Sequence, residues 1–274
     1  MSKRTRQREL ARLRARREAE RQRQRRRRAL ATYGVMGLVV AVAAVGGGLW
    51  LNRDEPAAPA ATTATTAPPN DARADAPTAP AAVACGGQVP GRVRHPTFRA
   101  APKARLDPDK TYEATFRTSC GSFVVRLDPK KAPITSANFV FLARRRFYDS
   151  TWFHRIVPGG QTGGIAVLQG GDPQGSGGGG PGYMIKDEKP ASPAAYKKYS
   201  VAMANSGQPN SGGSQFFIST ADNSKGLSAD YAVFGQVVSG QEAVDKIAAV
   251  PVGGERGDTP TQAVWIEKLT VKVR

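Results

Sequence analysis

The pattern of apolar and charged positions divides the chain into four stretches. The first is rich in Arg, Gln and Glu, with too few apolar positions to build a core. The second has no charged side chain, and its 19 residues would span about 28 Å as a helix, the thickness of one bilayer core. The third is mostly Ala, Pro and Thr and cannot repay its ordering entropy. We therefore expect a basic tail (1–32), a transmembrane helix (33–51), a disordered linker (52–84) and a folded domain (85–274).

Within the domain, short apolar runs are bounded by Gly-rich turns. Alternating or continuous apolar runs predict strands, and longer stretches with helical spacing predict two helices. Many short strands with only two helices favour a mainly β fold, a closed antiparallel barrel. Strands are expected over 111–118, 122–127, 201–204, 216–220, 231–238 and 264–273, and helices over 133–145 and 242–248.

The net charge of +18 is concentrated near the N-terminus. Residues 1–32 hold 14 basic and 3 acidic side chains, whereas residues 33–84 hold 2 basic and 4 acidic ones. Under the positive-inside rule, this asymmetry places the N-terminus in the cytoplasm and the domain outside the cell membrane. A cleaved signal peptide is the alternative, although the apolar stretch is longer than the about 7–15 residues that such peptides use.

The basic tail allows three interpretations. It can be a solvated block that sets membrane orientation, a segment that contacts anionic lipid headgroups, or a nonspecific binder of RNA phosphates. The adjacent apolar span already explains a positive flank, so the first two are favoured and no specific nucleic-acid partner is expected.

Composition disfavours several kinds of site. Two Cys and two His leave little material for a metal centre. The six glycines of residues 175–182 lack the Gly-Lys-Ser/Thr of a phosphate-binding loop, so a flexible surface loop is expected. The chain also lacks the Gly-x-Ser-x-Gly elbow of a serine hydrolase. No metal or organic cofactor is predicted.

The cysteines are Cys85 and Cys120. An even count in an oxidising compartment favours a disulfide between them, which would tie the start of the domain to the first predicted hairpin. Two unpaired thiols are the alternative.

Three sequence blocks carry the candidate chemistry. They are Phe153-His154-Arg155-Ile156-Val157-Pro158-Gly159, then Gln169-Gly170-Gly171-Asp172, then Met203-Ala204-Asn205-Ser206-Gly207 continuing to Gly213-Ser214-Gln215-Phe216-Phe217-Ile218. Over residues 112–273 the chain resembles the cyclophilin family of peptidyl-prolyl cis/trans isomerases, in a membrane-anchored bacterial, actinobacterial-like form. The resemblance implies a closed eight-stranded antiparallel barrel capped by two helices, with a proline-binding groove on its outer face.

The resemblance also implies a reaction, with Arg155 at its centre. Rotation about an X–Pro amide breaks the double-bond character of its C–N bond, against a barrier of about 18–20 kcal/mol. Twisting returns the lone pair to the prolyl nitrogen, and a guanidinium can donate a hydrogen bond to it. A surface ion pair is the alternative role for Arg155.

The pocket for the proline ring is assigned by the same resemblance. Phe153 and Phe217 would wall it, whereas Phe216 would point into the core because side chains alternate along a strand. The expected pocket residues are Phe153, Val167, Phe217, Leu227 and Tyr231.

The polar residues of the groove follow in the same way. Gln169 and Gln215 would hydrogen-bond peptide carbonyls. Ala204 and Asn205 would line the groove, with the Asn205 backbone holding the residue before proline. His154 adjoins Arg155 and is counted among the residues that line the groove. Isomerisation removes no proton, so a structural role is favoured for it over that of a general base. Asp172 is expected to shape a turn or the groove.

Two departures from the family pattern bear on the pocket. Nine residues, 160–168, stand where the family usually has three, and Ala166 and Val167 replace a Phe and a Met that line the pocket. Gly226 replaces a Trp that helps to bind cyclosporin in the family, so weak inhibition is expected.

The sequence therefore predicts a single-pass membrane-anchored isomerase that faces outward. Its substrates would be proline-containing segments of unfolded or exported polypeptides. A peptide-binding chaperone without efficient turnover is the alternative from another class, and a nucleic-acid-tethering protein is a third.

Overall fold

The computed structural model describes residues 79–91, 93–159 and 164–274. These residues all belong to one compact unit, Pro69–Arg274. The predicted basic tail (1–32), the predicted transmembrane helix (33–51) and linker residues 52–78 lie outside the described residues. Within the described part, no helix combines the length and apolar character needed to cross a membrane.

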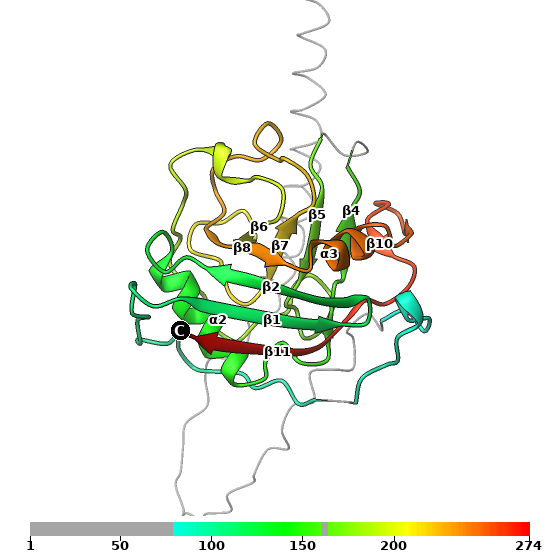
Figure 1. Ribbon diagram of the computed structural model, residues 1–274, viewed down its shortest axis with the longest axis horizontal. Coiled ribbons are helices and arrows are strands. Elements are labelled where there is room, and N and C mark those ends of the chain that lie inside the picture. The colour runs from blue at the N-terminus through cyan, green and yellow to red at the C-terminus, as the bar shows by residue number, and fades with distance from the viewer. Residues whose placement is uncertain (1–78, 92, 160–163) are drawn as a thin grey trace, which may run out of the picture. The chain divides into compact units, whose positions relative to one another are not determined.

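One antiparallel sheet dominates the fold. Its nine strands follow the order β3-β11-β1-β2-β8-β6-β7-β5-β4, and β1, β2 and β11 run side by side in Figure 1. A separate pair joins β9 (Val252–Gly253) to β10 (Thr259–Pro260). The strands of the main sheet are β1 (Tyr112–Thr118), β2 (Gly121–Leu127), β3 (Thr151–Trp152), β4 (Arg155–Val157), β5 (Val167–Gly170), β6 (Ser200–Met203), β7 (Phe216–Ser219), β8 (Val233–Ser239) and β11 (Trp265–Val273).

The two edges of this sheet are joined by a very short connection. Strands β3 and β4 lie at opposite edges, yet only Phe153 and His154 separate them in the chain. Three Cα–Cα steps reach at most about 11 Å, so the sheet must curl until its edges approach each other. No ladder joins β3 to β4 among the described residues. The expected closed eight-stranded barrel is therefore corrected to a curled sheet of nine strands.

Two helices pack on the sheet at positions close to those expected. Helix α2 (Pro133–Arg144) contacts β8 and β11, and α3 (Gln241–Ala248) contacts β2 and β5; they lie on opposite sides of the view in Figure 1. Proline suits the first turn of α2 because the N–H that it lacks would have no helical partner there. The Glu188 carboxylate accepts hydrogen bonds from the N–H groups of Ile134 and Thr135, both at 2.8 Å, and so caps this helix.

Aromatic rings fill the space between sheet and helix. The Phe116 ring stacks on that of Phe123 with centroids 4.6 Å apart, and it meets Phe216 edge-on at 5.6 Å. Phe139 of α2 reaches Phe234 of β8 at 5.1 Å. All five side chains are buried, and burying one such ring stabilises the fold by about 1.5–3 kcal/mol. Phe216 thus lies in the core, as its place on the strand predicted.

The start of the domain is tied to the sheet in two ways. Cys85 and Cys120 form the predicted disulfide, with Cα atoms 5.1 Å apart. Just before it, Ala263 donates its N–H to the Ala82 carbonyl at 2.8 Å and accepts from the Ala84 N–H at 2.9 Å. Ala84 is buried. The folded part therefore begins before Cys85, because the last residues assigned to the linker pair with the domain.

Candidate active site

One row of side chains crosses four strands on the outer face of the sheet. Arg155 of β4 stands opposite Gln169 of β5, which stands opposite Phe217 of β7, which stands opposite Ala202 of β6. Directly opposed residues of antiparallel strands project from the same face. Register alone therefore places a cation, an amide, a ring and a small residue in line.

The neighbouring row faces the other way. Ile156, Leu168 and Ile218 are opposed across three of these strands, β4, β5 and β7, and all three are buried in the interior core. Strand alternation thus separates the row that builds the site from the row that builds the core.

A chain of side-chain hydrogen bonds links Arg155 to a Gly-rich loop. Arg155 Nη1 donates to Gln169 Oε1 at 3.2 Å, and Gln169 Nε2 donates to Gln215 Oε1 at 3.0 Å. Gln215 Nε2 then donates to the carbonyls of Gly177 and Gly179, both at 2.9 Å. Each amide in the chain is oriented by the bond before it, so both predicted groove glutamines are held in one arrangement.

Asp172 holds the loop that ends this chain. Its buried carboxylate accepts the N–H groups of Gly177 at 2.7 Å, Gly179 at 3.1 Å and Gln174 at 2.7 Å. A Cβ on Gly179 would collide with Asp172 Oδ1, so the close approach requires glycine there. The loop expected to be flexible is therefore fastened at several points, and Asp172 shapes this turn, which is one of the two roles expected for it.

The structure adds a carboxylate that the sequence analysis missed. Arg155 Nε donates to Asp258 Oδ2 at 2.8 Å across a sequence separation of 103 residues, and the Asp258 side chain is only 6% exposed. The ion pair, which was the alternative role for Arg155, is present, and Arg155 also lies in the row with Gln169. No spacing motif marks Asp258. Its only signal is its place between Gly257, which has φ 66°, and β10.

An apolar cluster lies beside the polar row. The Phe217 ring meets Tyr231 edge-on at 5.3 Å, and Leu227 packs partly buried against the same cluster. The structure brings together the predicted pocket residues Val167, Phe217, Leu227 and Tyr231, with Ala204 at the cluster's side.

Tyr196 completes this cluster and was not predicted. It is buried, its hydroxyl donates to the Tyr231 carbonyl at 3.0 Å, and it accepts the Tyr231 N–H at 2.9 Å. Burial raises the pKa of the Tyr196 hydroxyl, which therefore stays protonated. Tyr196 follows the short 3-10 turn Pro193–Ala195, and a single aromatic in a loop carried no periodic signal in the sequence.

Phe153 does not join the pocket. Its ring is fully buried in the interior core, where it meets Phe216 edge-on at 6.2 Å. It follows β3, and its N–H is bonded to the Val264 carbonyl at 3.0 Å. The expectation that Phe153 walls the pocket is therefore corrected: the residue supports the backbone that carries Arg155.

His154 is buried beside the site. Its side chain meets Trp152 edge-on at 6.5 Å, and neither ring nitrogen has a hydrogen-bond partner among the described residues. Burial lowers the pKa of the imidazole, an effect that the Asp172 carboxylate partly opposes. A neutral and enclosed ring fits the structural role that was predicted.

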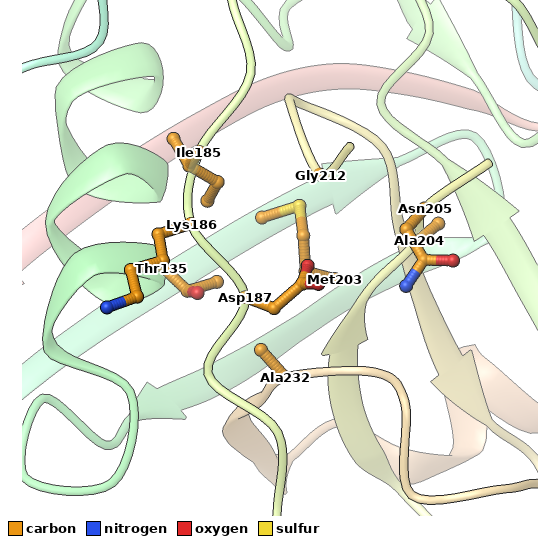
Figure 2. Close-up of a pocket in the computed structure, with 9 residues that line it drawn as sticks. All are labelled: Thr135, Ile185, Lys186, Asp187, Met203, Ala204, Asn205, Gly212 and Ala232. Atoms are coloured by element: carbon orange, nitrogen blue, oxygen red, sulfur yellow. The ribbon is translucent and has the colours of Figure 1, made fainter. Parts of the chain in front are cut away.

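One cavity adjoins the row, and a smaller one lies beside the predicted groove residues Ala204 and Asn205. The larger, about 520 Å³, is lined by His154, Arg155, Gln169 and Arg256 among others. The smaller, about 10 Å³, has room for one water. Figure 2 shows Met203 at its centre, between Thr135 on one side and the predicted groove residues Ala204 and Asn205 on the other. The larger cavity therefore adjoins Arg155, whereas the apolar residues Val167, Phe217, Leu227 and Tyr231 do not line it.

Asn205 is oriented by its own side chain. Its Nδ2 donates to the Asp230 carbonyl at 3.1 Å, and its Oδ1 accepts the N–H of Gly207 at 3.0 Å. Both bonds fix the turn after β6, which is the backbone expected to hold the residue before proline.

A buried amide supports the start of β5. Asn223 Nδ2 donates to the Ala166 carbonyl at 2.9 Å, and Asn223 Oδ1 accepts the Ala166 N–H at 2.8 Å. The two bonds fix the residue before Val167. Asn223 is a further residue that the sequence analysis did not single out.

One known protein family has a sequence model that matches the region containing the site. The model of the family described as cyclophilin type peptidyl-prolyl cis-trans isomerase/CLD matches residues 114–271. That range contains the whole row of site residues and also Asp258.

Curated proteins and solved structures agree with this match. The chain is 39% identical over 178 residues to peptidyl-prolyl cis-trans isomerase B of Streptomyces anulatus, covering 59% of this chain and 97% of that protein. It is 39% identical over 155 residues to the peptidyl-prolyl cis-trans isomerase of Helicobacter pylori, covering 52% and 90%. A cyclophilin type peptidyl-prolyl cis-trans isomerase of Cryptosporidium parvum superposes with a TM-score of 0.53 at 27% identity, covering 59% and 98%.

Proposed function

The chain belongs to the cyclophilin-type peptidyl-prolyl cis-trans isomerases, and we propose that Arg155 is the residue with which it accelerates rotation about X–Pro bonds. The observation that carries this proposal is the row that aligns Arg155, Gln169 and Phe217 on one face of the sheet. Adjacent strands lie about 4.8 Å apart, so Arg155 and Phe217 are about 10 Å apart at the backbone. An extended Arg side chain spans much of that distance, which brings its guanidinium near a proline ring that packs on Phe217.

The guanidinium has donors left for the substrate. Of its five N–H groups, Nε–H bonds Asp258 and one Nη1–H bonds Gln169. The other three have no hydrogen-bond partner among the residues that the structure describes. In the twisted amide the prolyl nitrogen regains its lone pair, and an N–H that donates to it stabilises the twisted form over either planar one.

The remaining residues bind the peptide on either side of this point. Val167, Phe217, Leu227 and Tyr231 offer apolar surface to the pyrrolidine ring. Gln169 lies beside Arg155 and would bond a substrate carbonyl through its remaining N–H. Both N–H groups of Gln215 are bonded to the Gly-rich loop, so Gln215 would hold Gln169 in place. The Asn205 turn would hold the residue before proline.

Substitution of Arg155 tests the proposal. In a prolyl-peptide isomerisation assay on the full-length chain, Arg155→Ala should lower kcat/KM about 100-fold, the loss seen when one donor to a transition state is removed. Arg155→Lys should recover only part, because an ammonium lacks the planar set of donors. The matched control is Arg117→Ala, which removes an exposed arginine paired with Glu267. If Arg155→Ala and Arg117→Ala keep equal activity, Arg155 has no part in the reaction.

We further propose where the domain lies. An anchor at residues 33–51 would hold it on the outer side of the cell membrane, where exported chains emerge. The uncharged span and the charge excess before it support this orientation. The Cys85–Cys120 disulfide supports it too, since such bonds persist in oxidising compartments. Protease added to intact cells should digest the domain and leave the N-terminal tail protected. A mature protein that begins after residue 51 would instead indicate signal-peptide cleavage.

The basic tail would add contacts with anionic headgroups on the cytoplasmic side. Each basic residue near such a surface contributes about 1 kcal/mol, and salt screens the attraction. When the wild-type chain is reconstituted in phosphatidylglycerol vesicles, the vesicle surface should protect residues 1–32 from trypsin at low salt but not at high salt. Equal digestion in phosphatidylcholine vesicles at low salt would exclude a headgroup contact.

A further inference from the structure

We propose that Asp258 is a positioning residue that sets the orientation of the Arg155 guanidinium in the reaction. This inference rests on the proposed role of Arg155. Asp258 lies 103 positions away in the chain and reaches the site from the turn before β10, on a different part of the fold from the groove residues.

Asp258 holds β4 through both its backbone and its side chain. Its carbonyl accepts the Ile156 N–H at 2.8 Å, and its Oδ2 accepts Arg155 Nε–H, also at 2.8 Å. The backbone bond fixes the position of Asp258 along β4. The side-chain bond then fixes the Arg155 guanidinium relative to the Asp258 carboxylate. An arginine on a three-residue strand thereby loses much of the rotamer freedom that a surface arginine keeps.

The geometry divides the donors of Arg155 between support and substrate. Asp258 binds the Nε edge of the guanidinium and Gln169 binds one Nη1–H, so two bonds to two different elements fix the plane of the group. A planar group held at two points has one orientation. Its free N–H groups therefore point in a direction that Asp258 and Gln169 together determine.

The Arg155–Asp258 ion pair joins a buried carboxylate to a partly exposed guanidinium. The Asp258 side chain is 6% exposed, whereas that of Arg155 is 33% exposed. Asp258 Oδ1 lies 3.4 Å from Arg256 Nε but has no hydrogen-bond partner among the described residues. A buried carboxylate needs a paired cation, and of the two arginines paired with Asp258 only Arg155 hydrogen-bonds it. The arrangement therefore favours the state in which Arg155 stays on Asp258.

A double-mutant cycle separates positioning from a general structural role. In full-length chain, Asp258→Ala should lower kcat about tenfold, since a small misplacement of a reacting group is that costly, while KM stays within about twofold. In the Arg155→Ala background, Asp258→Ala should cause no further loss in kcat, because there is no guanidinium left to orient.

Conservative variants sharpen the test. Asp258→Asn keeps an oxygen that accepts from Nε and should recover kcat to within about threefold of wild type. Asp258→Glu keeps the charge but moves the carboxylate by one methylene, so it should lower kcat at least about threefold, and only when Arg155 is present. The matched control is Glu267→Ala, which removes the partner of Arg117 on β11 and should leave kcat unchanged.

The outcomes decide between the two proposals. Wild-type kcat in Asp258→Ala, or an equal loss from it with and without Arg155, overturns the positioning role. If Asp258→Ala does not fold, as judged by thermal unfolding, the Asp258→Glu cycle gives the same decision. Loss of activity in Arg155→Ala together with full activity in Asp258→Glu overturns this inference alone, whereas full activity in Arg155→Ala overturns the proposed function.

Discussion

Gln169 stands directly opposite Arg155 on the β4–β5 ladder and accepts its Nη1–H at 3.2 Å while donating to Gln215 at 3.0 Å. The amide of Gln169 thus has its oxygen and nitrogen assigned by two different neighbours. It connects the guanidinium to the loop that Asp172 organises. Gln169 therefore acts on Arg155 from the side opposite to Asp258.

Removal of the Gln169 amide should slow the reaction more than it weakens binding. In Gln169→Ala, Arg155 loses one of its two anchors, and kcat should fall about tenfold because the donors to the twisted amide are misplaced. Steady-state isomerisation kinetics give kcat and KM separately. Gln236→Ala is the matched control, since it removes an exposed glutamine bonded to the Lys198 carbonyl. A change confined to KM would assign Gln169 to ground-state binding only.

The elements that the sequence predicted are those with strong local signals. The helices over 133–145 and 242–248 and the long strands β1, β2, β8 and β11 were found within about two residues, because period and turn residues define them locally. Strands β3, β4 and β5 were not predicted. They have two to four residues each, too few for a period, and pairing with distant strands alone makes them strands.

The site residues also divide into those with a local sequence signal and those defined only by distant contacts. Arg155, Gln169, Gln215 and Phe217 were found through ordered sequence blocks, and register brings them together. Asp258 and Asn223 act through tertiary contacts across 103 and 57 residues, which no spacing encodes. Phe153 was misplaced because adjacency to Arg155 in the chain does not fix the face on which a side chain lies.

The disulfide should contribute a large part of the domain's stability. Its sequence separation of 35 residues corresponds to about 4 kcal/mol on the chain-entropy model. Urea unfolding of the Cys85→Ser/Cys120→Ser double variant should show this loss in the free energy of unfolding. Dithiothreitol should destabilise the wild type by a similar amount and leave the variant unchanged. An equal effect of reductant on both proteins would contradict the assignment.

His154 should make stability depend on pH in a defined direction. Its pKa in the folded chain is lowered by burial, whereas in the unfolded chain it is about 6.5. Below about pH 6.5 the unfolded state therefore binds the proton first, so the free energy of unfolding falls as pH decreases through this window and recovers above it. Urea unfolding at several pH values should show this slope, and His154→Phe should remove its share. Identical slopes in both proteins would mean that the ring is not enclosed.

Asn223 should stabilise the domain through Ala166. Asn223→Ala leaves the buried N–H of Ala166 without its partner, whereas the Ala166 carbonyl keeps the Thr220 N–H at 2.9 Å. The unpaired N–H should cost about 1–2 kcal/mol in the free energy of unfolding. Because Ala166 precedes Val167 and Gln169, kcat/KM should fall as well. Lys225→Ala, an exposed neighbour, is the control for both measurements. Wild-type stability in Asn223→Ala would show that water or another group replaces the amide.

Cyclosporin should inhibit this isomerase only weakly. Gly226 is exposed and its N–H is bonded to the Asn223 carbonyl, so position 226 offers no indole where the resembling family commonly has Trp. Loss of a hydrogen bond and an aromatic contact should cost about 100-fold in affinity, which places inhibition in the micromolar range. Inhibition of peptide isomerisation measures this directly. Gly226→Trp should tighten inhibition by about tenfold, whereas Gly226→Ala should not. Nanomolar inhibition of the wild-type chain would show that the remaining groove binds the inhibitor without that ring.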